Sequence, residues 1–437
     1  MNKKIINLGI VGFGTVGMGV VKILQHSPAM FTEKTGLRPI IRKIVDIDKK
    51  RHRDVRIPAW ILSKNVQDVL DDSEINVVIE LTGNESAARK ILLDALSRKK
   101  NVITANKSAL AKYWDEIFAA ARKNGVEVYY ESAVCAGLPI IQVLQQGLAA
   151  NRISRIFGIV NGTTNYILTR MDRDDYSFKD ALVEAQKKGF AESNPTLDIN
   201  GYDSLHKIVI LSSLAFGKRV KIEDVYVEGI DKIEVSDIKN GAELGYVLKL
   251  LAIAKEEVNK EIEVRVHPTF LPKGHVLSSV EEEYNAVYIV GDLTGPIVLY
   301  GRGAGQMSAA SAVIGDLIYL GRRFVSGMSG RVDNIWEEKH SDLKIKGINE
   351  IRAEYYLRFS VVDSPGVLAK ISNILGMNDI SIAQVIQKSR FSGSVVPVVM
   401  MTHEAVEKNV QRALKLIDHL DIVKAKTVLI RVIGVRS

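Results

Sequence analysis

The sequence predicts an α/β protein in three parts. These are a doubly wound parallel sheet, then an α+β region, then a small βαββαβ domain of ferredoxin-like order. Three observations lead to this prediction. Short apolar runs alternate with longer amphipathic stretches over the first 130 residues, the pattern loosens from about residue 134, and a polar run at 337–346 precedes the last part. The 437 residues are enough for two or three domains.

The N-terminal part is expected to be a parallel sheet covered on both faces, because its strands are continuously apolar and alternate with helical patterns. Strands are predicted at residues 5–11, 40–45, 77–80, 101–104 and 126–130, with helices at 16–25, 86–98 and 110–123 among them. We place this domain at residues 1–133, completed by about 305–330.

The middle part, residues 134–304, mixes both kinds of element. Helices are predicted at 178–188, 204–216 and 242–257, and strands at 153–160, 261–267, 286–290 and 296–300. A linker is expected at 331–350 and a third domain at 351–437. This domain is predicted to contain a strand at 355–362, a helix at 367–375, two strands, a helix near 405–419 and a last strand at 426–432.

The composition excludes several classes of protein. With 46% apolar and 25% charged residues, the chain has the composition of a typical globular protein. No apolar run approaches the length of a membrane span. Cys135 is the single cysteine, so no internal disulfide is possible and a cytoplasmic location is expected. The net charge of +8 comes from scattered basic residues without interleaved aromatic ones, so neither nucleic acid nor a membrane is expected as a partner.

A glycine motif, GFGTVG at residues 12–17, follows the first predicted strand and precedes a helical pattern. In this position the glycines permit a tight turn and a close approach to a pyrophosphate at a helix N-terminus. The motif therefore predicts a Rossmann-like dinucleotide-binding domain. Its residues expected to contact the cofactor are Gly12, Phe13, Gly14, Thr15, Val16 and Gly17.

The sequence leaves the choice between NAD and NADP open. Asp46 ends the second predicted strand, where a carboxylate usually binds the ribose 2′-hydroxyl of NAD. Lys49, Lys50 and Arg51 follow and could instead bind a 2′-phosphate. Thr82, after a later strand, is also expected to line the cofactor.

Two lysines are candidates for the chemistry. Lys107 directly follows a predicted strand and should lie near the carboxyl edge of the sheet, although a surface lysine would give the same spacing. Asp203 could cap the next helix and shares one face with Lys207 at i,i+4. A surface ion pair is one interpretation; a lysine at the rim of a buried helix, suited to proton transfer, is the other.

Six blocks of sequence together resemble the homoserine dehydrogenase family. They are residues 12–17, 104–107 (TANK), 131–139 (ESAVCAGLP), 161–165 (NGTTN), 192–207, and 301–305 (GRGAG) followed by 309–313. The resemblance implies reversible, NAD- or NADP-dependent interconversion of L-homoserine and L-aspartate 4-semialdehyde. It also implies that the second domain binds substrate and supplies a dimer interface, giving a homodimer or homotetramer.

The resemblance also assigns roles to residues. Lys207 would be the proton donor, and Lys107 would lie between nicotinamide and substrate; Glu192 and Asp203 would hold the amino and hydroxyl ends of the substrate. Gly303 would be a late cofactor contact. A monovalent cation, usually sodium, would be held by Glu131, Val134, Ala136 and Leu138.

Two positions depart from the family pattern. Asn194 stands where the family often has Asp, which weakens any role of that side chain in local charge. Val45 stands where several members carry a basic residue, which removes one contact to a 2′-phosphate and favours NAD or dual use.

The third domain resembles the ACT regulatory domain through residues 363–369 (DSPGVLA) and 376–382 (GMNDISI). By this resemblance L-threonine is the expected effector, close to Gly366, Asn378 and Ile380. A domain that only mediates association is the alternative. An effector can act only by binding two states with different affinity.

Two other functions remain possible. A related amino- or hydroxy-acid dehydrogenase would share the glycine motif but not the 192–207 block. A non-catalytic dinucleotide sensor would need neither Lys107 nor Lys207. No aspartokinase-like segment precedes the glycine motif, so a monofunctional enzyme is expected.

Overall fold

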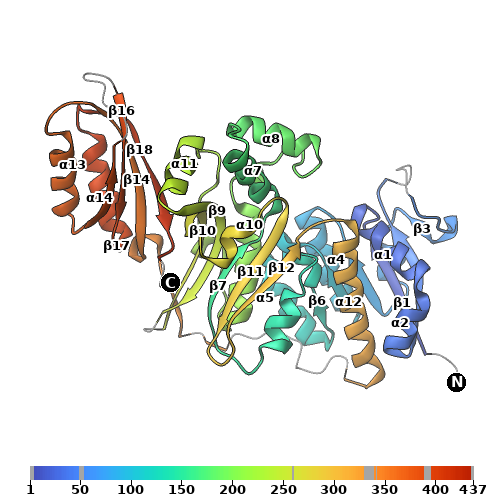
Figure 1. The fold of residues 1–437 in the computed structure, drawn as a ribbon. Coiled ribbons are helices and arrows are strands. Elements are labelled where there is room, and N and C mark those ends of the chain that lie inside the picture. The colour runs from blue at the N-terminus through green and yellow to red at the C-terminus, as the bar shows by residue number, and fades with distance from the viewer. Residues whose placement is uncertain are drawn as a thin grey trace. The chain divides into compact units, whose positions relative to one another are not determined.

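The structure is a computed structural model that describes residues 4–48, 54–257, 260–328, 339–340, 342–387 and 395–434 (Figure 1). The chain forms two compact units. The first comprises Met1–Ile153, Val209–Ile222 and Val290–Ser341; the second comprises Ser154–Ile208, Glu223–Ile289 and Asp342–Ser437. None of the helices in the described ranges combines the length and the apolar content that crossing a membrane requires.

The described residues of the first unit form a parallel sheet with the strand order β3-β2-β1-β4-β5-β6. Its strands are β1 (Lys4–Val11), β2 (Leu37–Val45), β3 (Leu62–Ser63), β4 (Val77–Glu80), β5 (Asn101–Thr104) and β6 (Val128–Tyr129). This order confirms the predicted doubly wound sheet. Successive strands are added on one side of β1 up to β3 and on its other side from β4 onward, so the strand order reverses between β1 and β4. Doubly wound sheets bind ligands at this point, outside the carboxyl ends of the strands.

Helices from distant parts of the sequence belong to this unit. They are α1 (Thr15–His26), α2 (Pro28–Thr35), α3 (Gln67–Leu70), α4 (Glu85–Ser97), α5 (Lys107–Asn124), α6 (Ile140–Gln142) and α12 (Gln306–Val325); strand β12 (Gly295–Arg302) also belongs to the unit. Of these helices, α1, α2 and α12 share the hydrophobic core of the unit. In Figure 1 the early elements are blue and cyan and α12 is orange. Gly19 on α1 lets α12 approach closely, because a Cβ there would lie 2.8 Å from the Cβ of Ala310.

The second unit contains a mixed sheet in which β11, β7, β9, β10, β18, β14, β16 and β15 are neighbours in that order. These strands are β7 (Ile153–Ile159), β9 (Tyr246–Glu256), β10 (Glu261–Pro272), β11 (Tyr284–Gly291), β14 (Arg352–Val362), β15 (Ile382–Ile386), β16 (Val395–Thr402) and β18 (Val423–Val432). Of the short strands, β8 (Tyr226–Val227) and β13 (Lys344–Ile345) pair with β10, and β17 (Ala405–Val406) pairs with β14. The helices are α7 (Gly162–Arg173), α8 (Phe178–Lys187), α9 (Thr196–Ile199), α11 (Val235–Glu243), α13 (Val367–Gly376) and α14 (Glu407–Asp418). Helix α10 (Tyr202–Phe216) begins in this unit, and its residues from Val209 on belong to the first unit.

The predicted βαββαβ domain is confirmed, with β14 lying between β16 and β18 and β15 beyond β16. Helices α13 and α14 pack on one face of this red and orange sheet in Figure 1. The sequence did not predict that its last strand also pairs with β10 of the preceding part, at Thr269↔Arg431 and Phe270↔Val432.

The linker expected at 331–350 is only partly described, since its residues 331–338 and 341 lie outside the described ranges. Its later residues are not a free tether: Lys344 and Ile345 form β13, which pairs with β10. The domain boundaries proposed from the sequence stay predictions.

The helix predicted at 242–257 is wrong for most of its length. Residues 246–256 form strand β9, which pairs with β10 over eleven residue pairs and with β7 on its other edge. Its central residues are buried without a break because the strand lies inside the sheet. A continuous apolar run has no alternation, so periodicity cannot distinguish such a strand from a buried helix. The helix predicted from 405 also starts late, because Ala405 and Val406 form β17.

Candidate functional site

The glycine motif forms the turn between β1 and α1. Gly12 has φ +102°, and a Cβ there would lie 2.6 Å from the carbonyl oxygen of Leu81. A Cβ on Gly17 would lie 2.3 Å from the carbonyl oxygen of Gly12. Helix α1 begins inside the motif, at Thr15, with Gly14 as its N-cap. The turn therefore presents the N-terminus of α1 to an anion, which fits a dinucleotide pyrophosphate.

Asp46 connects the end of β2 to this turn. Its Oδ2 accepts a hydrogen bond of 2.8 Å from the backbone amide of Phe13, and its Oδ1 accepts one of 2.8 Å from the amide of Asp48. The carboxylate thus lies beside the glycine motif, as a ribose-binding residue must. Lys49, Lys50 and Arg51 lie outside the described residues.

A buried carboxylate, Glu80, organises the carboxyl ends of β4 and β5. Its Oε1 accepts hydrogen bonds from the amide and the hydroxyl of Thr82, at 2.7 and 2.6 Å, and its Oε2 accepts one from the Thr104 hydroxyl at 2.5 Å. Burial raises its pKa, and these hydrogen bonds lower it in part. Asn106 donates to the carbonyl oxygen of Thr82 at 3.0 Å and caps α5. Lys107 is the first residue of α5 and is half-buried, which places it at the predicted edge of the sheet.

Lys207 belongs to the second unit, in the first half of α10. Its ammonium donates to the carbonyl oxygen of Val160 at 2.5 Å and to Oδ2 of Asp203 at 2.7 Å. Both Lys207 and Asp203 are 8% exposed. The pair is therefore buried, and the surface ion-pair interpretation is wrong. Helix α10 begins at Tyr202, so Asp203 lies inside the first turn and is not the N-cap that the sequence suggested.

Asn161 joins this pair to a second carboxylate. Its side-chain amide donates to Asp203 Oδ2 at 2.8 Å and to Asp198 Oδ1 at 2.7 Å. Three segments thus meet here: the turn from β7 to α7, short helix α9, and the start of α10. Asn161 lies in the 161–165 motif and Asp198 in the 192–207 block, but the sequence pattern predicted no role for either side chain. The sequence pattern also gave no role to Glu80 or Asp316. Glu80 ends an apolar strand and Asp316 lies within an apolar helix, and an acidic residue in such a segment is the signal that could have pointed to a buried carboxylate.

Glu192 lies in the loop between α8 and α9 and is exposed. Asn194, in the same loop, accepts hydrogen bonds through Oδ1 from the amide and the hydroxyl of Thr196, at 3.3 and 2.6 Å. An Asp carboxylate would supply the same acceptor. Asn194 therefore preserves these hydrogen bonds at the start of α9, although the family often has Asp at this position.

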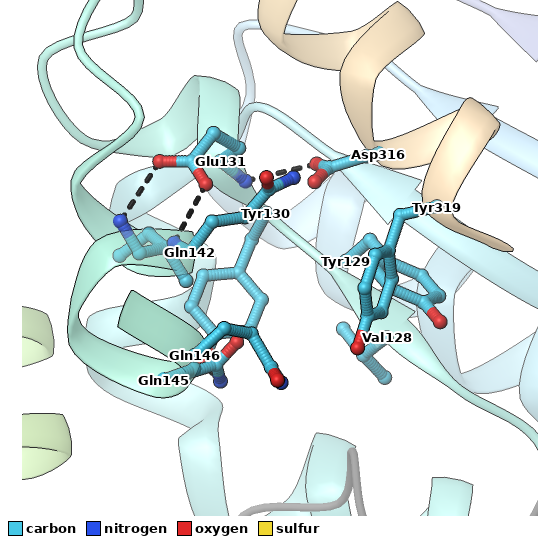
Figure 2. A pocket seen from close by; sticks show the side chains of 10 residues that line it. Val128, Tyr129, Tyr130, Glu131, Gln142, Gln145, Gln146, Asp316 and Tyr319 are labelled. Atoms are coloured by element: carbon cyan, nitrogen blue, oxygen red, sulfur yellow. Dashed lines mark hydrogen bonds between the residues drawn. The ribbon is translucent and has the colours of Figure 1, made fainter. Parts of the chain in front are cut away.

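Glu131 occupies a narrow pocket beside α12 (Figure 2). Its carboxylate accepts hydrogen bonds from the amides of Ile141 and Gln142, at 2.8 and 2.9 Å, and its own amide donates to Oδ2 of Asp316 at 2.9 Å. Burial raises the pKa of Glu131 to about 7 and holds that of Asp316 well above its usual range.

The loop expected to hold a cation follows Glu131. Cys135 has φ +50°, and a Cβ on Gly137 would lie 2.3 Å from the carbonyl oxygen of Arg302, so the backbone through Val134, Ala136 and Leu138 turns tightly. In the described part of the chain, no group of three or more His, Cys, Asp or Glu side chains could hold a metal ion. A cation here would depend on one carboxylate and on backbone carbonyls, which are hard donors that suit sodium.

Gly303 lies between β12 and α12, in the same unit as the glycine motif. In the C-terminal domain Gly366 is the N-cap of α13 with φ +86°. Asn378 is buried; its amide donates to the carbonyl oxygen of Ile374 at 2.8 Å and its Oδ1 accepts from Nε of Arg412 at 2.5 Å. Ile380 packs in the core of the domain. Only the backbone of Ile380 could therefore face a ligand without disturbing the core.

The fold and the glycine turn define a dinucleotide-binding protein with a C-terminal βαββαβ domain. Three family models match the chain: the homoserine dehydrogenase NAD-binding domain over residues 12–131, homoserine dehydrogenase over 139–318, and the ACT domain over 355–419. The homoserine dehydrogenases of Bacillus subtilis and Helicobacter pylori are 38% and 40% identical to it. The first alignment covers 96% of each chain; the second covers 96% of this chain and 97% of the relative.

Solved structures agree. The crystal structure of a homoserine dehydrogenase from Thiobacillus denitrificans has a TM-score of 0.94 and 40% identity, and the match covers 99% of both chains. A hyperthermophilic archaeal homoserine dehydrogenase in complex with NADPH has a TM-score of 0.61 and 26% identity, over 72% of this chain and 97% of the other. The chain belongs to the homoserine dehydrogenase family and uses a nicotinamide dinucleotide cofactor.

Proposed function

We propose that Lys207 is the group that gives a proton to the aldehyde oxygen of L-aspartate 4-semialdehyde and takes it back from the hydroxyl of L-homoserine. The observation that carries this proposal is the buried ammonium of Lys207, held between Asp203 and the carbonyl oxygen of Val160. An ammonium with a fixed direction and little access to water suits proton transfer. When bound, the nicotinamide supplies or accepts the hydride.

Other residues would bind and orient the substrate. Glu192 and Asp203 would hold its amino and hydroxyl ends, since an ammonium requires a carboxylate partner. Lys107 would contact both substrate and cofactor. This role is supported by the position of Lys107 at the start of α5. The hydrogen bonds of Glu80 and Asn106 fix the backbone that leads into this helix.

The dinucleotide would lie on the glycine motif. It would contact Gly12, Phe13, Gly14, Thr15, Val16, Gly17, Asp46, Thr82, Lys107 and Gly303. Either NAD or NADP is proposed. Asp46 beside Phe13 favours NAD, whereas NADPH is the ligand of the archaeal relative.

The remaining sites are proposals of the same kind. Sodium would be held by Glu131, Val134, Ala136 and Leu138. L-threonine would bind the C-terminal domain near Gly366, Asn378 and Ile380, and the chain would form a homodimer or homotetramer. We also propose the four-part division into residues 1–133 with 305–330, 134–304, 331–350 and 351–437.

The test follows NAD(P)H absorbance with L-homoserine, each cofactor in turn, and L-threonine present or absent. Lys207→Ala is compared with wild type and with Lys100→Met. Lys100 is also buried, but it directly precedes β5, at the end of the strand opposite to Lys107, and its ammonium donates to the backbone carbonyls of Asp72 and Ile75. The loss of Lys100 should therefore leave turnover intact.

Turnover that is lost only in Lys207→Ala supports the assignment, and an effect of threonine assigns the effector. Full turnover in Lys207→Ala removes Lys207 from the reaction. Absence of turnover by wild-type protein that binds NAD(P) would favour the sensor alternative.

A further inference from the structure

Asn161, at the junction of β7 and α7, contacts both carboxylates beside Lys207. We propose that Asn161 is a positioning residue: it fixes the Asp203 carboxylate and, through it, the direction of the Lys207 ammonium. This inference depends on the proposed role of Lys207 in proton transfer.

Three hydrogen bonds hold the side-chain amide of Asn161. Its Oδ1 accepts from the amide of Thr164 at 2.8 Å, which caps α7, and its two N–H groups go to Asp203 and Asp198. The residue is 5% exposed. An amide with three such bonds has a single orientation, so it can define the orientation of its partners.

Consecutive residues of one turn hold Lys207 in two ways. The carbonyl oxygen of Val160 accepts directly from the ammonium, and Asn161 donates to the same Asp203 oxygen that Lys207 contacts. If that oxygen moved, the ammonium would have to follow it or lose its charged partner. The turn therefore determines the position of both members of the pair.

A neutral bridge is the chemistry that this cluster requires. Asp198 and Asp203 are both acidic, and an Arg or Lys between them would compete with Lys207 for Asp203. An amide donates to both carboxylates without adding charge, so Lys207 stays the cation that balances Asp203.

Helix capping alone does not explain Asn161. A cap requires only an oxygen acceptor, which Ser or Asp supplies nearly as well as Asn. The two N–H donors are additional, and they reach residues 37 and 42 positions away in the sequence.

Two substitutions separate these roles. Asn161→Ser keeps a capping oxygen but is too short to reach the carboxylates. Asn161→Asp keeps the cap and replaces both donors with a third carboxylate facing Asp198, Asp203 and Lys207. Ser177→Ala removes the exposed cap of α8 and is the control for the effect of cap loss on folding.

We expect Asn161→Ser to lower kcat about 10- to 100-fold. Its Tm should fall further than that of Ser177→Ala, because two carboxylates lose a donor at a buried site, but the protein should stay folded and NAD(P)H binding, followed by fluorescence, should be unchanged. Asn161→Asp should lower kcat at least as much and move the basic limb of the kcat pH profile upward, because added negative charge makes the ammonium keep its proton.

Wild-type kcat and pH profile in both variants would overturn the proposal. So would a loss of kcat that matches an equal loss of folded protein by circular dichroism, because the role would then be structural. An active Lys207→Ala contradicts the proposed function itself. An inactive Lys207→Ala beside a fully active Asn161→Ser contradicts only the positioning role.

Discussion

Lys207 on α10 and Lys249 on β9 are both buried lysines of the second unit, 8% and 3% exposed, but their ammonium groups have different partners. Lys207 contacts the carboxylate of Asp203. Lys249 donates to the carbonyl oxygen of Val280 and to Oδ1 of Asn165, which are both neutral. Helix α7 takes part in both sites, through Asn161 at its N-cap and Asn165 one turn later.

The consequence for Lys249 is a pKa lowered to about 8, because burial disfavours its charged form, while Glu281 and Asp172 offset this only in part. Burial by itself therefore does not mark a lysine as a proton donor. What distinguishes Lys207 is a carboxylate in direct contact and a second one bridged to it by Asn161.

The largest difference between the two lysines should appear in catalysis. Lys207→Met is expected to lower kcat by about 10²- to 10⁴-fold, the usual contribution of a general acid. Lys249→Met should keep kcat within a few-fold of wild type, because Lys249 has no role in proton transfer. Steady-state turnover of homoserine measures both. An equal loss of kcat in the two variants would contradict a specific role of Lys207 in proton transfer, because both losses would then follow from the removal of a buried lysine.

The carboxylate partner should matter next. Asp203→Asn leaves a buried ammonium without its counter-ion, so we expect a loss of about 3 kcal/mol in the free energy of unfolding. The double variant Lys207→Met with Asp203→Asn should recover part of this loss, since no unpaired charge remains. Urea unfolding of wild type, Lys207→Met, Asp203→Asn and the double variant gives a double-mutant cycle, which measures the interaction energy between the two side chains. Additive effects would mean that the two side chains do not interact.

Lys249 should make stability depend on pH. Its pKa is about 8 when folded and 10.5 in its ordinary state, so the unfolded chain holds more protons between these values. The contribution of Lys249 to the free energy of unfolding should therefore rise with pH in this window, by at most about 1.4 kcal/mol per pH unit. Below pH 8 both states are protonated and the contribution is flat. The difference between wild type and Lys249→Met, from urea unfolding at several pH values, isolates it; a constant difference would contradict the shift.

Glu80 is the acidic counterpart of Lys249, and its substitution should have the smallest effect. Its carboxylate has neutral partners, Thr82 and Thr104, and burial raises its pKa. Glu80→Gln keeps an acceptor of similar shape and should change the free energy of unfolding by about 1 kcal/mol or less. Glu80→Ala leaves the donors unpaired and should cost more. A Glu80→Gln variant as unstable as Glu80→Ala would show that the negative charge itself is needed.

Several features could be predicted because they depend on short stretches of sequence. The glycine turn requires residues that permit φ +102° at Gly12 and contact at Gly17. The Asp203–Lys207 pair follows from the i,i+4 spacing of one helix. The βαββαβ order follows from alternating periodicities. Each of these is fixed by neighbours in the sequence.

Other features depended on residues far apart in the chain. Residues 246–256 became a central strand because β7 and β10 cover both of its edges, although the apolar run also suited a helix. The burial of Lys207 and its contact with Val160 required a turn 47 positions earlier in the sequence.

The sequence by itself determined the fold class, the glycine turn and the i,i+4 pairing of Asp203 with Lys207. Only the tertiary structure decided that this pair is buried, that Asn161 bridges it to Asp198, and that β18 joins β10. The physical reason is that local patterns fix backbone geometry and periodicity. Burial and the choice of polar partners depend instead on which distant segments pack together.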